Sequence, residues 1–207
     1  MPMITLTWHG HSCWSAAFDG YTLVIDPYGP DTVPGLAPLA LTANEVLCSH
    51  EHSDHGYREA VKLLPGGPSP FKVTVLDSWH DGEEGALRGP NKIFVLEAGG
   101  LRIAHLGDLG CRPAAAQLAA LKDLDALMVP VGGHYTIGPE EARDLCKILH
   151  PRVILPMHYT TDEYGYPVLA RLTAFTELMD NVTYSKTNTI EIARETPAQT
   201  AVLTYLG

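Results

Sequence analysis

The sequence predicts an α/β fold in which two β-sheets pack together and helices lie on the outside. Short apolar or β-branched runs alternate with segments of helical periodicity along the chain. The two halves also share a coarse pattern. A turn at 19–20 precedes a strand that ends at Asp26, and a turn at 99–100 precedes a strand that ends near Asp108. Two similar halves of this kind would form a two-sheet core with helices outside it.

Length and composition agree with one packed domain that spans residues 1–207. Apolar residues make up 45% of the chain and charged residues 18%, which is typical of a globular enzyme and not of a disordered chain. No linker that would divide the 207 residues into two units is present.

The first half of the chain consists mainly of predicted strands joined by turns. The segment 27–38 is rich in Pro and Gly and is expected to be a loop that forms one wall of a cleft. A short helix is expected at 57–64, because Pro and Gly at 65–68 stop it. A long polar, glycine-rich loop is expected at 81–92. Strands are expected at residues 3–8, 13–18, 21–25, 46–48, 71–76, 93–96 and 101–106.

The second half alternates helices with strands. A helix at 113–121 begins with Pro113, at a position where the missing N–H costs little. A clearer helix spans 139–149, with two glutamates near its positive end and one apolar face. A third helix is expected at 168–179. Strands are expected at residues 126–129, 153–155, 182–193 and 201–206.

One segment dominates the chemistry: residues 49–55, with the sequence SHEHSDH, directly follow the apolar run 46–48. If that run is a strand, His50 and His52 leave its end at a period of two and point the same way. Asp54 and His55 would then lie on the following loop, so that one segment supplies ligands to two neighbouring metal ions. A lone surface histidine is usually only solvated, but three with a carboxylate in seven residues predict a site for Zn, Mn or Fe.

Polar side chains recur where other predicted strands end, and several strands that end together would bring them to one rim. These candidates are Asp26, His50, His52, His80, Asp108 and His158.

The segment 49–55 resembles the H-x-H-x-D-H motif of the metallo-β-lactamase superfamily. The later segments LGD at 106–108 and PMHY at 156–159 are similar to its downstream motifs. Within it, the chain resembles the small metal-dependent hydrolases that include the ascorbate-6-phosphate lactonase. The resemblance runs from near residue 4 to about 160, and it implies the four-layer αββα sandwich of that superfamily.

The resemblance also implies a role for each residue of the motifs. Asp108 would bridge two metal ions, and Asp26 would be structural. The first ion would bind His50, His52 and His80, and the second would bind Asp54, His55 and His158.

Five further histidines are weighed against these ligands. His80 is favoured over His105 because it ends a strand before a loop, whereas His105 alternates within a predicted strand and points to the core or to the site. His134 would reach the substrate or be solvated. His9 and His11 would form a structural rim or touch the substrate, and His150 would cap a helix.

The expected enzyme is a metal-dependent hydrolase with two divalent ions, zinc being favoured and manganese or iron also suitable. A hydroxide between the ions would attack the carbonyl or phosphoryl centre of a small ester, lactone or phosphoester. Asp54 would orient this hydroxide or accept its proton. Arg88 would bind an anionic group of the substrate, or would merely hold its loop in place.

Two alternative functions remain open: a nuclease of the same superfamily, and a non-catalytic metal-binding or sensor protein. The net charge of −10 and the absence of a basic run argue against nucleic acid and anionic membranes as partners. Four cysteines without a C-x-x-C motif, and no apolar run of membrane-spanning length, favour a cytoplasmic protein. The sequence leaves a homo-oligomer open.

Overall fold

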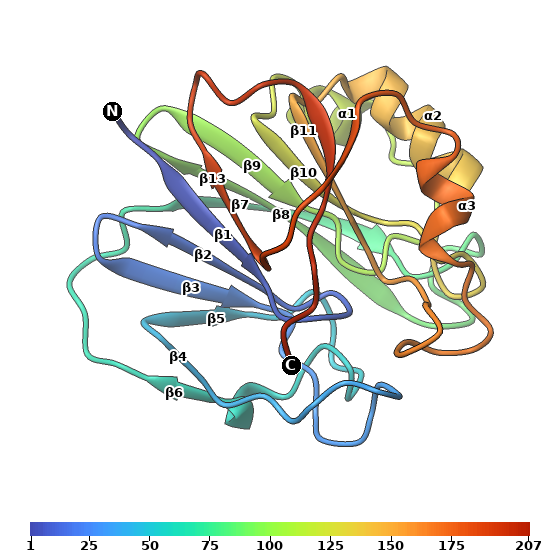
Figure 1. The fold of residues 1–207 in the computed structure, drawn as a ribbon, viewed down its shortest axis with the longest axis horizontal. Coiled ribbons are helices and arrows are strands. Elements are labelled where there is room, and N and C mark those ends of the chain that lie inside the picture. The colour runs from blue at the N-terminus through green and yellow to red at the C-terminus, as the bar shows by residue number, and fades with distance from the viewer.

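Two β-sheets packed face to face make up most of the computed structural model, which describes residues 1–207 (Figure 1). The five-stranded sheet has the order β13-β1-β2-β3-β5 and contains β1 (Ile4–Trp8), β2 (Trp14–Phe18), β3 (Tyr21–Ile25), β5 (Glu45–Leu47) and β13 (Thr189–Ile192). The seven-stranded sheet has the order β12-β14-β11-β10-β9-β8-β7 and contains β7 (Lys72–Trp79), β8 (Pro90–Ala98), β9 (Leu101–His105), β10 (Ala126–Pro130), β11 (Val153–Met157), β12 (Val182–Tyr184) and β14 (Gln199–Val202).

Helices cover only one side of this sandwich. The helices α1 (Ala115–Ala120), α2 (Pro139–Leu149) and α3 (Leu172–Thr176) lie together against the seven-stranded sheet, at the upper right of Figure 1. The central strand β10 is therefore buried along its whole length, which explains its uninterrupted apolar sequence. None of these helices combines the length and the apolar character needed to cross a membrane.

The main core contains 38 buried residues, which come from both sheets and from the helices that cover the seven-stranded sheet. On β1 the burial alternates, so that Ile4, Leu6 and Trp8 point into the core while the residues between them are half-buried. A second cluster of 7 buried residues lies on the outer face of the five-stranded sheet. There the cover consists of the two-stranded sheet of β4 (Leu41–Ala43) and β6 (Val61–Leu63), a 3₁₀ turn η1 (Arg58–Ala60) and the loop after β3, with no α-helix.

The repeat expected from the sequence is present as two hairpins, one in each sheet. The turn at Asp19 and Gly20 joins β2 to β3, and the turn at Gly99 and Gly100 joins β8 to β9. All four turn residues have positive φ, the conformation that matches the twist of a two-residue hairpin.

Several expected elements differ from the structure. Residues 57–64 form η1 and β6 instead of a helix, because so short a segment is a marginal helix. Val61 instead joins the second buried cluster, and β6 pairs with β4. The helix expected at 168–179 shrinks to α3, since the Ala170 N–H donates to the carbonyl of Gly132 and ties the preceding segment to the loop after β10.

The strand expected at 182–193 is divided between the two sheets as β12 and β13. A local turn separates them, in which the Thr187 N–H donates to Ser185 Oγ at 3.1 Å. The last strand is Gln199–Val202 instead of 201–206, and the loop expected at 81–92 is shorter because β8 already begins at Pro90.

Candidate metal centre

Five strands end at one rim of the sandwich, and each is followed by residues of the candidate site. In the seven-stranded sheet β7 and β9 both run antiparallel to β8, and β9, β10 and β11 are parallel, so β7, β9 and β11 end on the same side. In the facing sheet β3 and β5 are also parallel. The residues that follow these ends are Asp26, the segment 49–55, His80, Asp108 and His158.

The structure brings all seven residues expected to bind metal into overlapping groups whose donor atoms lie within 4.8 Å of one another. One group contains His50, His52 and His80; another contains His11, Asp54, His55 and His158; a third contains His50, His55 and Asp108. The residues that the sequence assigns to a first ion thus lie together, as do those assigned to a second. His11 joins the second group.

Asp108 lies between the residues assigned to the first ion and those assigned to the second. Its Oδ2 atom is 3.2 Å from His80 Nε2, 3.1 Å from His55 Nε2 and 3.2 Å from His158 Nε2. Burial raises the pKa of Asp108, but His158 and His55 outweigh it and hold that pKa well below its usual value. The carboxylate is therefore ionised and offers oxygen to both sets of imidazoles.

A tight turn positions Asp108. The preceding Gly107 has φ +56°, and a Cβ atom there would lie 2.3 Å from Asn91 Oδ1. Any residue with a side chain at this position would therefore force the neighbouring atoms to move. Asn91 is fully buried, accepts the Asp108 N–H at 2.9 Å and donates to the carbonyl of Leu106 at 2.9 Å. Asn91 therefore fixes the turn from the neighbouring strand.

Asp26 supports one histidine assigned to each ion: His55 directly and His50 through Ser49. Its carboxylate accepts from Ser49 N at 2.6 Å and from Ser49 Oγ at 2.6 Å, and it lies 2.9 Å from His55 Nδ1. Ser49 Oγ also lies 2.9 Å from His50 Nδ1. The Nδ1 atoms of His55 and His50 are thereby engaged, directly or through Ser49, and their Nε2 atoms face the site.

His80 and His105 have different surroundings. His80 Nδ1 lies 3.0 Å from the carbonyl oxygen of Tyr135, which leaves Nε2 facing Asp108. Both ring nitrogens of His105 are occupied inside the core: Nε2 lies 2.9 Å from the carbonyl of Ser12, and Nδ1 accepts the Gly107 N–H at 3.0 Å. His80 belongs to the cluster and His105 to its support.

His11 was expected at the rim, and the structure buries it beside Asp54. Its Nε2 atom is 3.3 Å from Asp54 Oδ2, and burial, helped by nearby His158, lowers the pKa of His11 to about 4. The sequence feature that identifies His11 as a candidate is its position shortly after a strand end, which it shares with His50. The left-handed backbone of Gly10 (φ +100°) and His11 (φ +49°), which belongs to the turn that carries the ring, is not visible in the sequence.

The other histidines lie outside the cluster. His9 Nε2 is 2.6 Å from Ser15 Oγ, and His134 is exposed and packs edge-on against Tyr135. His150 ends α2 with φ +50°, where its backbone N–H bonds the carbonyl of Cys146.

A cavity of about 290 Å³ opens over the cluster. Its lining residues are His52, Asp54, His80, Arg88, Asp108, Tyr135 and Tyr166. Arg88 is the one basic residue among them, and its guanidinium lies 5.4 Å from the centre of the Tyr135 ring. The carboxylate of Asp81 accepts four backbone N–H groups of the loop, including that of Arg88 at 2.7 Å, and so shapes the segment that presents Arg88.

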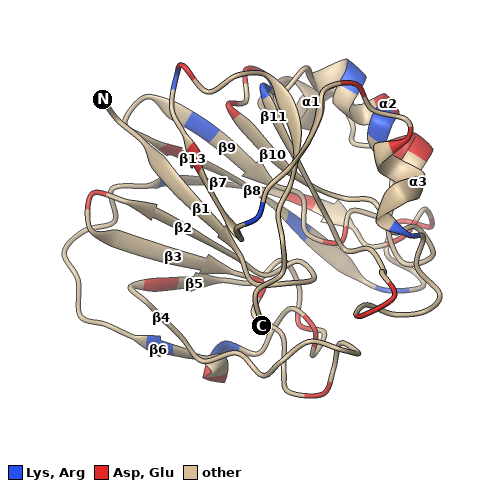
Figure 2. Cartoon of the chain, in the orientation of Figure 1, with Lys and Arg blue, Asp and Glu red and all other residues tan.

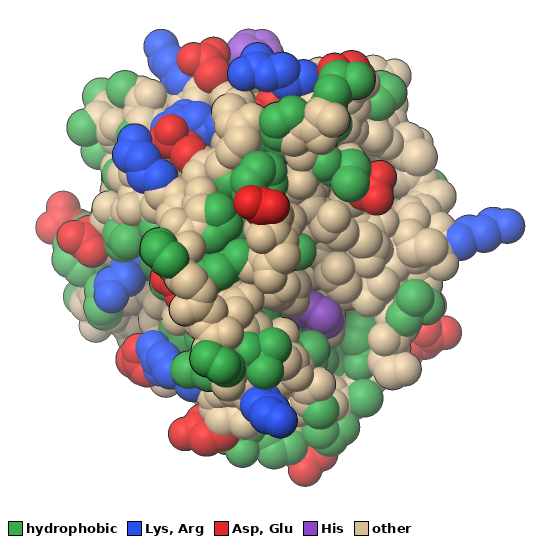
Figure 3. All heavy atoms as spheres, turned by 90° about the vertical axis from the view of Figure 1, so that its left-hand side faces the viewer, with side chains coloured by type: hydrophobic (Ala, Val, Ile, Leu, Met, Phe, Trp, Pro, Cys, Tyr) green, Lys and Arg blue, Asp and Glu red, His purple; other side chains and the backbone are tan.

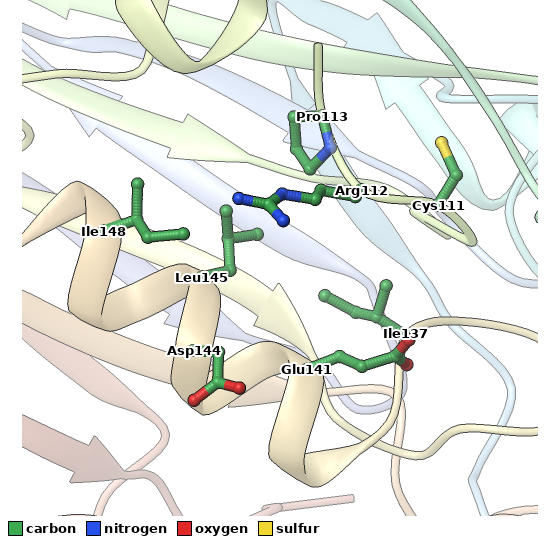
Figure 4. A pocket seen from close by; sticks show the side chains of 8 residues that line it. All are labelled: Cys111, Arg112, Pro113, Ile137, Glu141, Asp144, Leu145 and Ile148. Carbon is green, nitrogen blue, oxygen red and sulfur yellow. The ribbon is translucent and has the colours of Figure 1, made fainter. Parts of the chain in front are cut away.

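A second cavity of about 430 Å³ lies away from this cluster, between α2 and the segment after Asp108 (Figure 4). Arg112 extends across it toward Leu145 and Ile148, and Glu141 lines it from the first turn of α2. None of the clustered histidines lines this cavity, so the candidate metal centre lies with the smaller one.

Comparisons with known proteins agree with this architecture. A sequence profile of the β-lactamase superfamily domain matches residues 5–158. A UPF0173 metal-dependent hydrolase from Desulforamulus reducens is 26% identical over 90% of this chain and 96% of its own length. Another from Thermoplasma acidophilum is 28% identical over 78% of this chain and 85% of its own.

A solved structure shows the same likeness. A candidate Zn-dependent hydrolase of the metallo-β-lactamase superfamily from Thermotoga maritima is 31% identical, with a TM-score of 0.72 and 97% of each chain covered. The chain therefore belongs to the metallo-β-lactamase superfamily, and the expected α/β sandwich is confirmed, although the outer layer over the five-stranded sheet contains no α-helix. Its relatives carry the name of the enzyme class that the sequence predicts, metal-dependent hydrolases.

Proposed function

We propose that this metal-dependent hydrolase holds two divalent metal ions at the rim where strands of both sheets end, and hydrolyses a small ester, lactone or phosphoester that carries an anionic group. The observation that carries the proposal is the position of Asp108, whose Oδ2 atom lies within 3.2 Å of imidazole nitrogens from both groups. His50, His52 and His80 would hold the first ion, Asp54, His55 and His158 the second, and Asp108 both.

The chemistry of the donor set supports metal binding. The buried Nε2 atoms of His50, His55 and His158 form no hydrogen bond, although those of His55 and His158 lie close to Asp108 Oδ2, and Asp108 Oδ1 has no partner either. Buried polar atoms without partners are costly, and a cation would supply the missing interaction. Imidazole and carboxylate together suit zinc best, and manganese or iron also accept them.

Two divalent ions in these positions would lower the pKa of a water molecule and stabilise negative charge on the attacking and leaving oxygens. Asp54 would orient the attacking water, because its carboxylate lines the cavity and the Tyr166 hydroxyl donates to its Oδ2 at 3.3 Å. Arg88 would bind the anionic group of the substrate, with Tyr135 supporting the guanidinium.

The surface supports a small substrate over a polynucleotide. One arginine lines the cavity, and the chain has a net charge of −10. Lys and Arg are scattered among Asp and Glu along the whole ribbon (Figure 2). The face opposite the strand ends, shown in Figure 3, has no continuous basic area either. A nuclease needs many phosphate contacts along a groove, which this arrangement does not offer.

The test is elemental analysis of the protein purified without chelator, together with hydrolysis of a panel of lactones, carboxylic esters and phosphodiesters. We expect about two ions per chain and turnover in the panel. His52→Ala should bind fewer ions and lose turnover. The control is His150→Asn, which changes an exposed histidine at the end of α2 to a residue that tolerates positive φ.

Each other outcome has a definite meaning. Two ions without turnover on any substrate class would favour the non-catalytic metal-binding protein. One ion per chain in the wild type would contradict the shared position of Asp108, and none after reconstitution with zinc, manganese and iron would remove the proposal altogether.

A further inference from the structure

We infer that His11 is a ligand of the second metal ion, and that the two metal positions are unequal because of it. This inference rests on the proposed dinuclear site and adds a residue that the H-x-H-x-D-H segment does not contain.

The polar contacts of the chain leave the His11 ring unsatisfied, although a carboxylate lies near it. The side chain is 3% exposed, and neither Nδ1 nor Nε2 has a hydrogen-bond partner. Its ring centre lies 4.3 Å from that of His158 and 5.3 Å from that of His55, and its Nε2 is 3.3 Å from Asp54 Oδ2. Three imidazoles and a carboxylate meet here, and buried polar atoms normally have a partner.

The backbone holds His11 in this place. The Trp8 Nε1–H donates to the carbonyl of His11 at 3.0 Å, and the backbone N–H of His158 donates to the same oxygen at 3.3 Å. The Cys13 N–H closes the turn on the carbonyl of Gly10 at 2.9 Å. His11 and His158 are thus joined through their main chains, although they come from the two different sheets.

The donor count then differs between the two positions. The second ion would receive His11, His55, His158, Asp54 and the shared Asp108, whereas the first would receive three histidines and the shared carboxylate. A position with one more donor and a second carboxylate should bind a divalent ion more tightly and fill first. Five protein donors also exceed the four of a tetrahedral zinc site, so zinc at this position would be five-coordinate, and manganese or iron would fit it as well.

Access differs in the same direction. Besides the shared Asp108, two of the three donors of the first position, His52 and His80, line the cavity, whereas only Asp54 does so at the second. The three histidines of the second position are buried and do not line it: His11, His55 and His158. The first position is therefore the more open to the cavity, and the second reaches it only through Asp54 and Asp108.

The test compares zinc and manganese titrations of chelator-stripped wild type, His11→Gln and His9→Gln, followed by calorimetry. His9 is the matched control, because it lies on the same turn but bonds Ser15 outside the cluster. The wild type should show a tight and a weaker site. His11→Gln should weaken the tight site about tenfold or more and leave the weaker one, and His9→Gln should keep both.

A second readout needs no variant. In crystals of the zinc-loaded wild type, anomalous scattering should place an ion about 2.1 Å from a ring nitrogen of His11. An ion farther than roughly 3 Å from both nitrogens would overturn the inference while leaving the dinuclear proposal intact. Two unchanged sites in folded His11→Gln would do the same. A wild type that binds no metal would instead overturn the proposed function.

Discussion

At the scale of single residues, Asp26 is the support that the two proposed metal positions have in common. It binds His55 directly and reaches His50 through Ser49. Burial raises the pKa of Asp26, but the hydrogen bond from His55 and the neighbouring imidazoles outweigh it, and the pKa stays below its usual value. The carboxylate is therefore ionised at neutral pH, and as an acceptor it selects the Nδ1–H form of His55.

The variant Asp26→Asn should weaken binding of both ions about 10- to 100-fold, because an amide nitrogen cannot accept from Ser49 or His55. Metal titration with zinc measures the change. Asp19→Asn serves as the control, since Asp19 is exposed in a hairpin turn with φ +49°, which asparagine tolerates. Loss confined to one of the two ions would show that Asp26 supports only one ligand.

Arg88 should act on substrate binding and not on the reaction step. Arg88→Met keeps the length of the side chain but removes the charge, so KM for an anionic substrate should rise about tenfold or more while kcat changes little. Steady-state kinetics with a charged and an uncharged substrate of one class measure this. Arg112→Met, in the separate cavity, should leave KM unchanged. Equal effects on both substrates would assign Arg88 to its loop alone.

The strand-end residues were predictable because a strand followed by a polar side chain leaves a signal in the sequence. His50, His52, His80, Asp108 and His158 were found in this way, and the structure brings them together. The place of His11 was not predictable. It depends on a left-handed turn and on a hydrogen bond from His158, 147 residues later in the chain, and neither leaves a periodic pattern.

At the scale of elements, the two hairpins bring their carboxylates to the same histidine. Asp26 follows β3 of one sheet and Asp108 follows β9 of the other, and they lie 2.9 Å and 3.1 Å from the two ring nitrogens of His55. The repeated pattern of turn, strand and carboxylate is therefore also a repeat in space around the site. The outer cover at 57–64 could not be predicted, because its pairing with β4 depends on a distant strand.

The turn that carries Asp108 should tolerate no side chain at Gly107. Gly107→Ala should destabilise the fold by roughly 1–3 kcal/mol and weaken metal binding, because φ is +56° and a Cβ would press on Asn91. Gly20→Ala is the matched control: its φ is +75°, but nothing lies within 4 Å of the added atom. Urea unfolding measures the stability of both variants and zinc titration their metal affinity, so that the comparison separates the effect of crowding from that of backbone strain. If both variants lost the same metal affinity, Gly107 would have no particular role in the site.

At the scale of the whole molecule, the stability of the metal-free protein should depend on pH through its buried histidines. Burial lowers the pKa of His11 to about 4 and that of His50 to about 3. In the unfolded chain both would titrate near 6.5, so below that pH the unfolded state binds more protons and stability falls. His55 and His80 have raised pKa values and act in the opposite direction.

A comparison of variants isolates His11 from these opposing groups. Between pH 7 and pH 5, in chelator, wild type should lose up to about 2 kcal/mol more unfolding free energy than His11→Gln, since one proton contributes about 1.4 kcal/mol per pH unit. Urea unfolding at the two pH values measures the difference. A larger pH dependence in His11→Gln would mean that the folded protein protonates His11.

Metal binding should also join the two sheets. His11 and the segment 49–55 follow strands of the five-stranded sheet, whereas His80, Asp108 and His158 follow strands of the seven-stranded sheet, so each proposed ion would bind donors from both. A ligand that binds only the folded state stabilises it by about 2.7 kcal/mol at a free concentration of 100 Kd. Removal of metal by chelation should therefore lower Tm, and hydrogen exchange should speed up at the rim of both sheets together.

The double variant His52→Ala, His11→Gln is the control for direct effects of the chelator, and its Tm should change little when the chelator is added. Faster exchange at only one rim would mean that the ions are held by one sheet, which the position of Asp108 between the two groups argues against.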